Sequence, residues 1–180
     1  MRSDRRGGGH VGCAGVNAEE RPILFVDVDG VISLFGFEDE HRPAGDFHLV
    51  EGLHHYIGAT AGELLARLDE VFELVWATGW EHRANEHLPS LLDLPGKELP
   101  TVTFDEQPMW GTAHWKISAV DRYAGRRPAA WIDDSLDERC EEWAEHRAAP
   151  TLLVPTEPAV GVTPDQVERL LEWARDLKTG

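Results

Sequence analysis

Five short apolar segments of the chain predict β-strands. The first, residues 23–28, is an apolar run bounded by Pro22 and Gly30, and the second covers residues 71–77. Runs of this length are typical of strands that are buried on both faces of a parallel sheet. The remaining three strands are predicted over residues 101–104, 129–132 and 151–154.

Five helices are predicted between and after these strands, over residues 60–67, 81–92, 112–124, 135–146 and 163–174. Three of them begin with Ser or Thr followed three residues later by Glu or Gln, which is the spacing of a capping box. The three pairs are Thr60 with Glu63, Ser135 with Glu138, and Thr163 with Gln166. Thr112 is the expected cap of the helix that it opens.

The order of these elements predicts the fold class. Residues 35–46 are charged and contain Gly and Pro, which indicates a loop, and residues 47–50 and 53–57 then predict a hairpin. From residue 23 onward, strands otherwise alternate with helices, which is the pattern of an α/β fold with an open parallel sheet. Ligands of such sheets bind beyond the carboxyl ends of the strands.

Composition narrows the possibilities further. The chain has 180 residues, of which 42% are hydrophobic, so we expect one domain over residues 21–180 and a flexible tail over residues 1–20. The net charge of −16 disfavours a protein that coats DNA or RNA, because it repels phosphate backbones. No apolar run approaches the roughly 20 residues that a membrane helix needs. With only Cys13 and Cys140, no disulfide framework is expected, and a reducing cytoplasm is the predicted compartment.

Polar residues that could carry chemistry follow several of the predicted strands. The set comprises Asp27 and Asp29 in FVDVDGV, Thr78 in WATGW, Lys116 in HWK, and Asp133 and Asp134 in WIDDS. Each of these residues also has an interpretation that involves no chemistry. Asp27 and Asp29 could form a turn, Thr78 could cap a helix, Lys116 could be a surface lysine, and Asp133 and Asp134 could lie in a loop. In a parallel sheet, however, all of them would meet at one edge, and this ordered set is far more specific than any one of its members.

The chemistry of this set points to phosphoryl transfer. Like charges about 4 Å apart repel by about 4 kcal/mol at an effective dielectric constant near 20, so clustered carboxylates favour a bound divalent cation such as Mg²⁺. A threonine hydroxyl at a helix start and a lysine ammonium suit phosphate oxygens. One carboxylate can act as a nucleophile while a second handles the proton.

These motifs resemble those of the haloacid dehalogenase (HAD) superfamily of aspartate-nucleophile phosphatases. The resemblance extends from residue 23 to residue 154 and implies a Rossmann-like core. It implies that Asp27 is the nucleophile and Asp29 the general acid and base. It further implies a Mg²⁺ ion held by the Asp27 carboxylate, the Asp29 backbone carbonyl and Asp133. The implied phosphate ligands are Thr78, Gly79 and Lys116, and the implied second acid of the last motif is Asp134 or Asp137, with Asp134 favoured.

A finer resemblance concerns the substrate. The strings LFVDVDGV, WATGWEHRAN, HWK and AWIDD are similar to a group of compact bacterial HAD domains named for Swiss Army Knife RNA repair proteins. This similarity suggests the terminal phosphate of a nucleotide or nucleic acid as substrate, although a phosphorylated small molecule stays open. The segments between the motifs are too short for an independent cap domain, so we expect an open site that only the hairpin covers.

Several residues near the site have two interpretations. Arg83 could bind phosphate or form a surface ion pair, and Trp80 could stack on a base or lie at the edge of the core. For His54 and His55 on the hairpin, exposure to solvent is favoured over contact with substrate.

Two other functions remain open at this stage. A phosphotransferase of the same fold is disfavoured because its usual cap is missing. A phospho-accepting receiver domain uses similar residue types, but the order of the acids and the lysine along this chain disfavours it.

Overall fold

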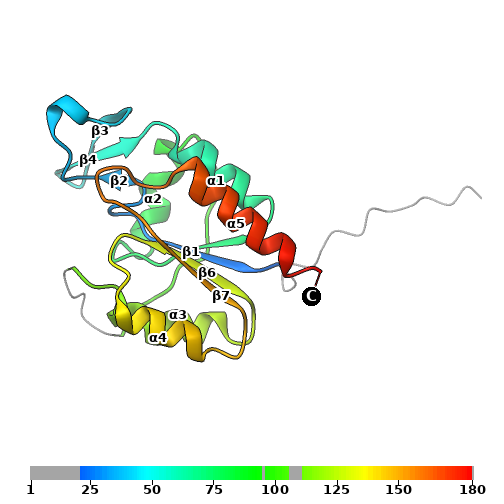
Figure 1. Ribbon diagram of the computed structural model, residues 1–180. Helices are drawn as coiled ribbons and strands as arrows, with labels where there is room; N and C mark the ends of the chain where they lie inside the picture. The colour runs from blue at the N-terminus through cyan, green and yellow to red at the C-terminus, as the bar shows by residue number, and fades with distance from the viewer. Residues whose placement is uncertain (1–20, 95, 106–110, 180) are drawn as a thin grey trace, which may run out of the picture.

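A four-stranded parallel sheet forms the centre of the molecule (Figure 1). The computed structural model describes residues 21–94, 96–105 and 111–179, so the predicted tail over residues 1–20 lies outside the described residues. The strands follow the order β5-β1-β6-β7. Their bounds are β1 (Ile23–Val26), β5 (Glu73–Trp76), β6 (Ala129–Asp133) and β7 (Thr151–Pro155).

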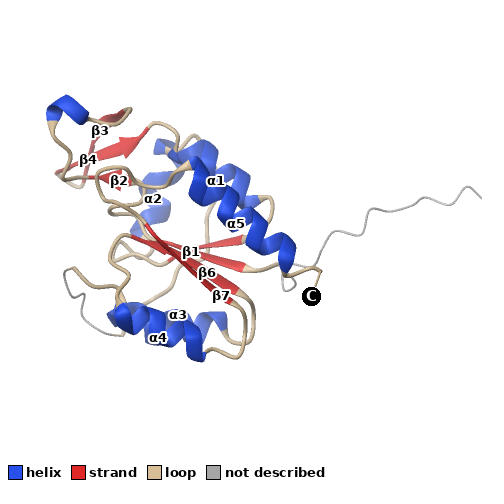
Figure 2. Ribbon diagram, in the orientation of Figure 1, coloured by secondary structure: helices blue, strands red, loops and turns tan. Residues whose placement is uncertain are grey.

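Helices cover both faces of this sheet (Figure 2). Side chains along each strand alternate between the two faces, so a strand that is apolar throughout offers both faces to helices. In β1, Leu24 and Val26 belong to one hydrophobic cluster, and Ile23 and Phe25 belong to the other. The first cluster includes residues of α1 (Ala61–Asp69), α2 (Arg83–Leu91) and α5 (Pro164–Asp176). The second includes residues of α3 (Ile117–Ala124) and α4 (Glu138–His146). The predicted α/β fold with flanking helices is thereby confirmed.

A small antiparallel sheet continues the chain directly after β1. It consists of β2 (Ser33–Leu34), β3 (Gly45–Val50) and β4 (Leu53–Gly58) in the order β2-β4-β3, with the short 3-10 helix η2 (Asp39–His41) between β2 and β3. We call residues 33–58 the flap. The predicted hairpin is its β3–β4 part, and its two-residue turn places Glu51 and Gly52 at φ values of 50° and 84°. The described residues contain no large cap domain.

The predicted strand over residues 101–104 is wrong, since only an isolated bridge between Thr101 and Trp76 is present. The Trp76 N–H donates to the Pro100 carbonyl, and the Val102 N–H donates to the Trp76 carbonyl, each at 2.8 Å. Because Pro100 has no N–H, it cannot donate a further bond to the ladder on that side.

The helix starts match the predicted caps in only one of the four cases. Thr163 and Gln166 form the predicted capping box of α5, with Pro164 in its first turn. The Thr60 side chain makes no capping bond at the start of α1. Asp137 rather than Ser135 caps α4, because Ser135 bonds to the acids that precede it. Thr112 does not begin a helix, since the 3-10 helix η3 (His114–Lys116) precedes α3.

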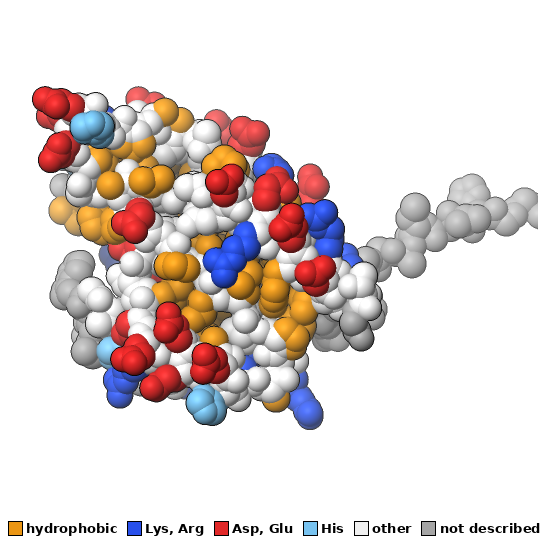
Figure 3. All heavy atoms as spheres, viewed as in Figure 1, with side chains coloured by type: hydrophobic (Ala, Val, Ile, Leu, Met, Phe, Trp, Pro, Cys, Tyr) orange, Lys and Arg blue, Asp and Glu red, His pale blue; other side chains and the backbone are white. Residues whose placement is uncertain are grey.

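The surface reflects the composition. Acidic side chains are spread over the face of the molecule shown in Figure 3, in keeping with the net charge of −16. Among the helices of the described residues, none is both long and apolar enough to cross a membrane.

Candidate active site

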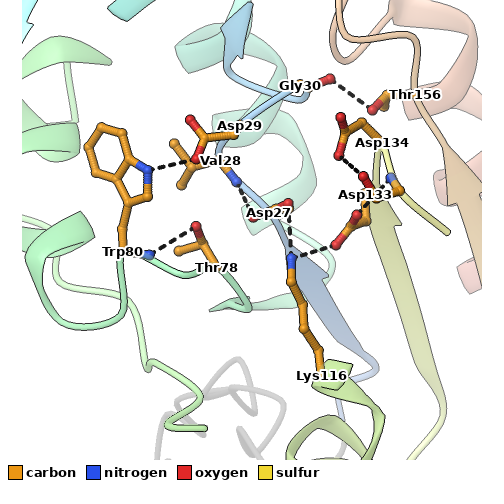
Figure 4. Close-up of polar contacts among 11 residues, drawn as sticks. Asp27, Val28, Asp29, Gly30, Thr78, Trp80, Lys116, Asp133, Asp134 and Thr156 are labelled. Atoms are coloured by element: carbon orange, nitrogen blue, oxygen red, sulfur yellow. Dashed lines mark hydrogen bonds and ion pairs between the residues drawn. The ribbon is translucent and has the colours of Figure 1, made fainter. Parts of the chain in front are cut away.

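Four buried polar side chains meet at the carboxyl edge of the parallel sheet (Figure 4). Asp27 comes directly after β1, Thr78 lies two residues beyond β5, and Asp133 is the last residue of β6. Lys116 reaches the same place from η3. Their exposed fractions are 7%, 0%, 0% and 4% respectively, so the charged members require partners inside the protein.

Lys116 lies between two carboxylates. Its Nζ atom is 2.9 Å from Asp27 Oδ2 and 2.7 Å from Asp133 Oδ2. The other oxygens are held by backbone amides: Asp27 Oδ1 accepts from Val28 N–H at 2.8 Å, and Asp133 Oδ1 accepts from Ser135 N–H at 2.9 Å. Burial works to lower the pKa of Lys116, but the two carboxylates outweigh it and raise that pKa above its ordinary value. Lys116 is therefore a structural member of the site and not a surface lysine.

The cluster still holds more negative charge than one lysine balances. Oxygens of Asp27, Asp133 and Asp134 all lie within 4.8 Å of one another. Burial and the Asp27 carboxylate raise the pKa of Asp133 to about 7, although Lys116 acts in the opposite direction. Burial also raises the pKa of Asp134. A set of crowded carboxylate oxygens is the ligand type that a hard divalent cation such as Mg²⁺ prefers, so these residues fit such an ion.

Gly30 and Thr156 fix the position of the loop after β1. Gly30 has a φ of 73°, and a Cβ atom placed there would come within 2.5 Å of the Asp134 carboxyl group. The buried hydroxyl of Thr156 donates to the Gly30 carbonyl at 2.9 Å. Thr156 was not among the predicted site residues, although it follows the last strand just as Asp27 and Thr78 follow theirs.

Asp29 lies apart from the other acids, and in Figure 4 its side chain points toward Trp80. Its side chain is 51% exposed. The Trp80 indole N–H donates to Asp29 Oδ2 at 3.0 Å, and His55 Nδ1 is 4.0 Å from Asp29 Oδ1. Partial burial raises the pKa of Asp29, against the lowering effect of the Trp80 hydrogen bond.

The structure overturns one of the interpretations given for His54, His55 and Trp80. The favoured interpretation of His55 as solvent-exposed is wrong, because its side chain is only 16% exposed and faces Asp29 and Trp80. His54 is exposed, as that interpretation expects. Trp80 packs at the edge of the hydrophobic cluster that contains Leu24 and Val26, and it also contacts Asp29.

Thr78 and Gly79 lie at the start of the loop that leads to α2. Thr78 Oγ1 accepts a hydrogen bond from the Trp80 N–H at 3.3 Å, and a hydroxyl that accepts such a bond still has its own proton to donate. The helix itself begins at Arg83, so Thr78 is not its N-cap. Gly79 is exposed, and a side chain there would meet no protein atom within 4 Å.

Two further candidates lie outside the acidic cluster. Asp137 caps α4 by accepting from the Cys140 N–H at 3.2 Å, and its Oδ2 atom lies 2.5 Å from His114 Nδ1. Arg83 forms an ion pair with Glu51 of the flap at 2.9 Å. Of the two acids considered for the last motif, the geometry thus places only Asp134 beside Asp27 and Asp133.

Comparison with known families gives a match that covers this site. A family model described as the HAD domain in Swiss Army Knife RNA repair proteins matches residues 23–167, well over half of the chain. HAD domains are in general phosphatase-type hydrolases, and they generally use Mg²⁺. Among curated proteins, no match was found. The chain belongs to this family of HAD domains of Swiss Army Knife RNA repair proteins.

Proposed function

We propose that the protein is a Mg²⁺-dependent phosphomonoester hydrolase that works through an aspartyl-phosphate on Asp27. The observation that carries this proposal is the Lys116 ammonium held between Asp27 and Asp133, with Asp134 beside them at the sheet edge. The arrangement fixes one oxygen of Asp27 by the Val28 amide, which holds the carboxylate in a single orientation for attack.

The metal would be held by the Asp27 carboxylate, the Asp29 backbone carbonyl and Asp133, with the Asp134 carboxylate close by. When bound, Mg²⁺ supplies the positive charge that stabilises the phosphate oxygens during transfer. Lys116 is already paired with two acids, so it cannot balance a phosphate dianion alone. The roles of Thr78 and Gly79 as further phosphate ligands are part of this proposal.

The reaction would proceed in two steps. An Asp27 oxygen attacks phosphorus, the bond from phosphorus to the ester oxygen breaks, and the departing alcohol takes its proton from Asp29. Asp29, now a carboxylate, then accepts a proton from the water whose oxygen attacks the phosphorus. The bond from phosphorus to Asp27 breaks, which releases inorganic phosphate and restores both carboxyl groups. The half-exposed position of Asp29 suits a group that must exchange protons with substrate and water.

We further propose that the substrate phosphate is the terminal phosphate of a nucleotide or nucleic acid. The family description, which names RNA repair proteins, supports this class of substrate. The absence of a large cap in the described residues also supports it, because an open site admits a phosphate on a large molecule. A net charge of −16 favours contact with the end of such a molecule over contact along its length.

The activity can be tested with p-nitrophenyl phosphate in the presence and absence of Mg²⁺. We expect turnover that depends on Mg²⁺ and that Asp27→Asn abolishes, since an amide is a very poor nucleophile. Asp176→Asn, an exposed change in the last turn of α5, is the matched control and should retain full turnover. Equal turnover by the wild type and Asp27→Asn would refute the proposed mechanism.

A substrate panel addresses the substrate class separately. It compares mononucleotides, oligonucleotides phosphorylated at the 3′ or 5′ end, sugar phosphates and phosphopeptides. We expect the highest kcat/KM for a nucleotide or an oligonucleotide end. A clear preference for sugar phosphates would retain the hydrolase and reject the nucleic-acid substrate.

A further inference from the structure

Asp29 is held differently from the other acids of the site. Asp27 and Asp133 each bond to a backbone amide and to the buried Lys116 ammonium. The Asp29 carboxylate instead has one hydrogen bond from a described side chain, the 3.0 Å bond from the Trp80 indole. A half-exposed aspartate can turn about its side-chain bonds unless such a partner fixes it.

Trp80 is itself fixed from three directions. Its backbone N–H donates to Thr78 Oγ1, and its ring packs against the hydrophobic cluster that contains Leu24 and Val26 of β1. The His55 ring contacts it edge to face, with centroids 4.6 Å apart and an interplanar angle of 66°. His55 is held in turn by Ser33, whose Oγ atom is 3.0 Å from His55 Nδ1. The loop after β5 and two strands of the flap thus converge on one carboxylate.

We propose that Trp80 is a positioning residue that aims Asp29 at the leaving oxygen, and that His55 of the flap supports it. This inference rests on the proposed phosphatase function. A general acid must lie within hydrogen-bond reach of the oxygen that it protonates, and a misplacement of about 1 Å can cost about 10²-fold in rate. The flap therefore contributes to proton transfer and does more than cover the site.

Dependence on the leaving group distinguishes this role from a merely structural one. An ester whose leaving group is a stable anion, such as 2,4-dinitrophenyl phosphate, needs little help from an acid, whereas an alkyl phosphate needs full protonation. Trp80→Phe keeps an aromatic ring but removes the N–H. We expect it to lower kcat/KM, which reports the step in which the leaving group departs, by roughly tenfold or more on an alkyl phosphate and by less than about threefold on the dinitrophenyl ester.

Trp143→Phe is the matched control, because the indole of Trp143 in α4 also donates to an aspartate, Asp121 of α3, at 3.0 Å. It should leave the ratio of the two rates unchanged. In the Asp29→Asn background, Trp80→Phe should have no further effect on the alkyl phosphate, since the two residues act through one step.

An equal loss on both esters, or an additive loss in the double variant, would overturn the proposal. If Trp80→Phe does not fold, as judged by circular dichroism, His55→Ala replaces it and should show the same selective loss. An unselective response of His55→Ala would then count against the proposal. Failure of the wild type to hydrolyse either ester would instead reject the underlying phosphatase function.

Discussion

Single residues of one type take different roles at this site because their surroundings differ. Asp27 and Asp133 are buried and paired with Lys116, and Asp134 accepts from the Ser135 hydroxyl at 2.9 Å. Asp29 is instead held by Trp80 of a loop and lies close to His55 of the flap. Neighbouring carboxyl groups with different environments are the usual basis for dividing nucleophile, metal ligand and proton donor among them.

Gly30→Ala tests how tightly one residue sets this arrangement. Alanine would be strained at a φ of 73°, and its Cβ would collide with Asp134. Gly36→Ala is the control, since Gly36 has a φ of 76° but no atom within 4 Å of the added Cβ. We expect each change to cost about 1–3 kcal/mol of unfolding free energy, with the larger loss for Gly30→Ala. Urea unfolding measures both, and only Gly30→Ala should also reduce Mg²⁺-dependent turnover.

At the scale of elements, the side chains that cap helices also connect them to the site. Ser135 bonds to Asp133 and Asp134, whereas Asp137 caps α4 and pairs with His114 of η3. The start of α4 is therefore tied both to the acidic cluster and to the segment that carries Lys116.

Asp137→Ala should lower the unfolding free energy by about 1 kcal/mol at pH 7, whereas Asp137→Asn should cost less because asparagine also caps helices. Partial burial acts against it, but hydrogen bonds from His114 and the Cys140 amide lower the pKa of Asp137 below its ordinary value. Its stabilising effect is therefore full above the unfolded pKa, near 4, and is lost as the pH falls through the lower folded pKa. Urea unfolding at a series of pH values should show the wild type and Asp137→Ala converging in acid. A constant difference down to pH 2 would contradict this.

An element could be predicted from the sequence where contacts between residues close in the chain determine it. It could not be predicted where contacts between residues far apart in the chain determine it. The apolar run of β1 is a local signal, and its burial is complete. The pair Ser135 and Glu138 has the spacing of a capping box too, but the Ser135 hydroxyl bonds to the neighbouring Asp134, and Asp137 caps α4 instead. β2 has only two residues and exists through its pairing with β4, so no local pattern reveals it. His55 was misjudged for the same reason, because the pattern of the hairpin does not say which of its faces meets the site.

Across the whole molecule, the order of strands explains why residues far apart in sequence meet. β1 lies between β5 and β6, so the residues after these three parallel strands reach one edge. Parallel pairing was the only assumption needed to predict that Asp27, Thr78 and Asp133 converge. The contacts of Asp29 with the flap could not be predicted in this way, because the strand order of the parallel sheet does not say where the flap lies.

A molecule with a charge of −16 and a carboxylate cluster should gain stability from a divalent cation that binds the folded state. At a Mg²⁺ concentration of about 100 times Kd, the expected gain is about 2.7 kcal/mol, seen as a rise in Tm. Asp133→Asn should abolish this rise, with each variant compared to its own metal-free Tm. Asp176→Asn should preserve it.

A second group of possible metal ligands provides an alternative site against which the Tm experiment can be judged. Oxygen and nitrogen atoms of Glu51, Glu86 and His87 also lie within 4.8 Å of one another, at the contact between the flap turn and α2. The two glutamates are exposed, and Glu51 already pairs with Arg83 at 2.9 Å, so we expect this group to hold Mg²⁺ weakly at most. Glu86→Gln should therefore leave the rise in Tm intact. If the rise instead survives Asp133→Asn and disappears in Glu86→Gln, the ion that stabilises the protein binds at the flap and the acidic cluster is not its site.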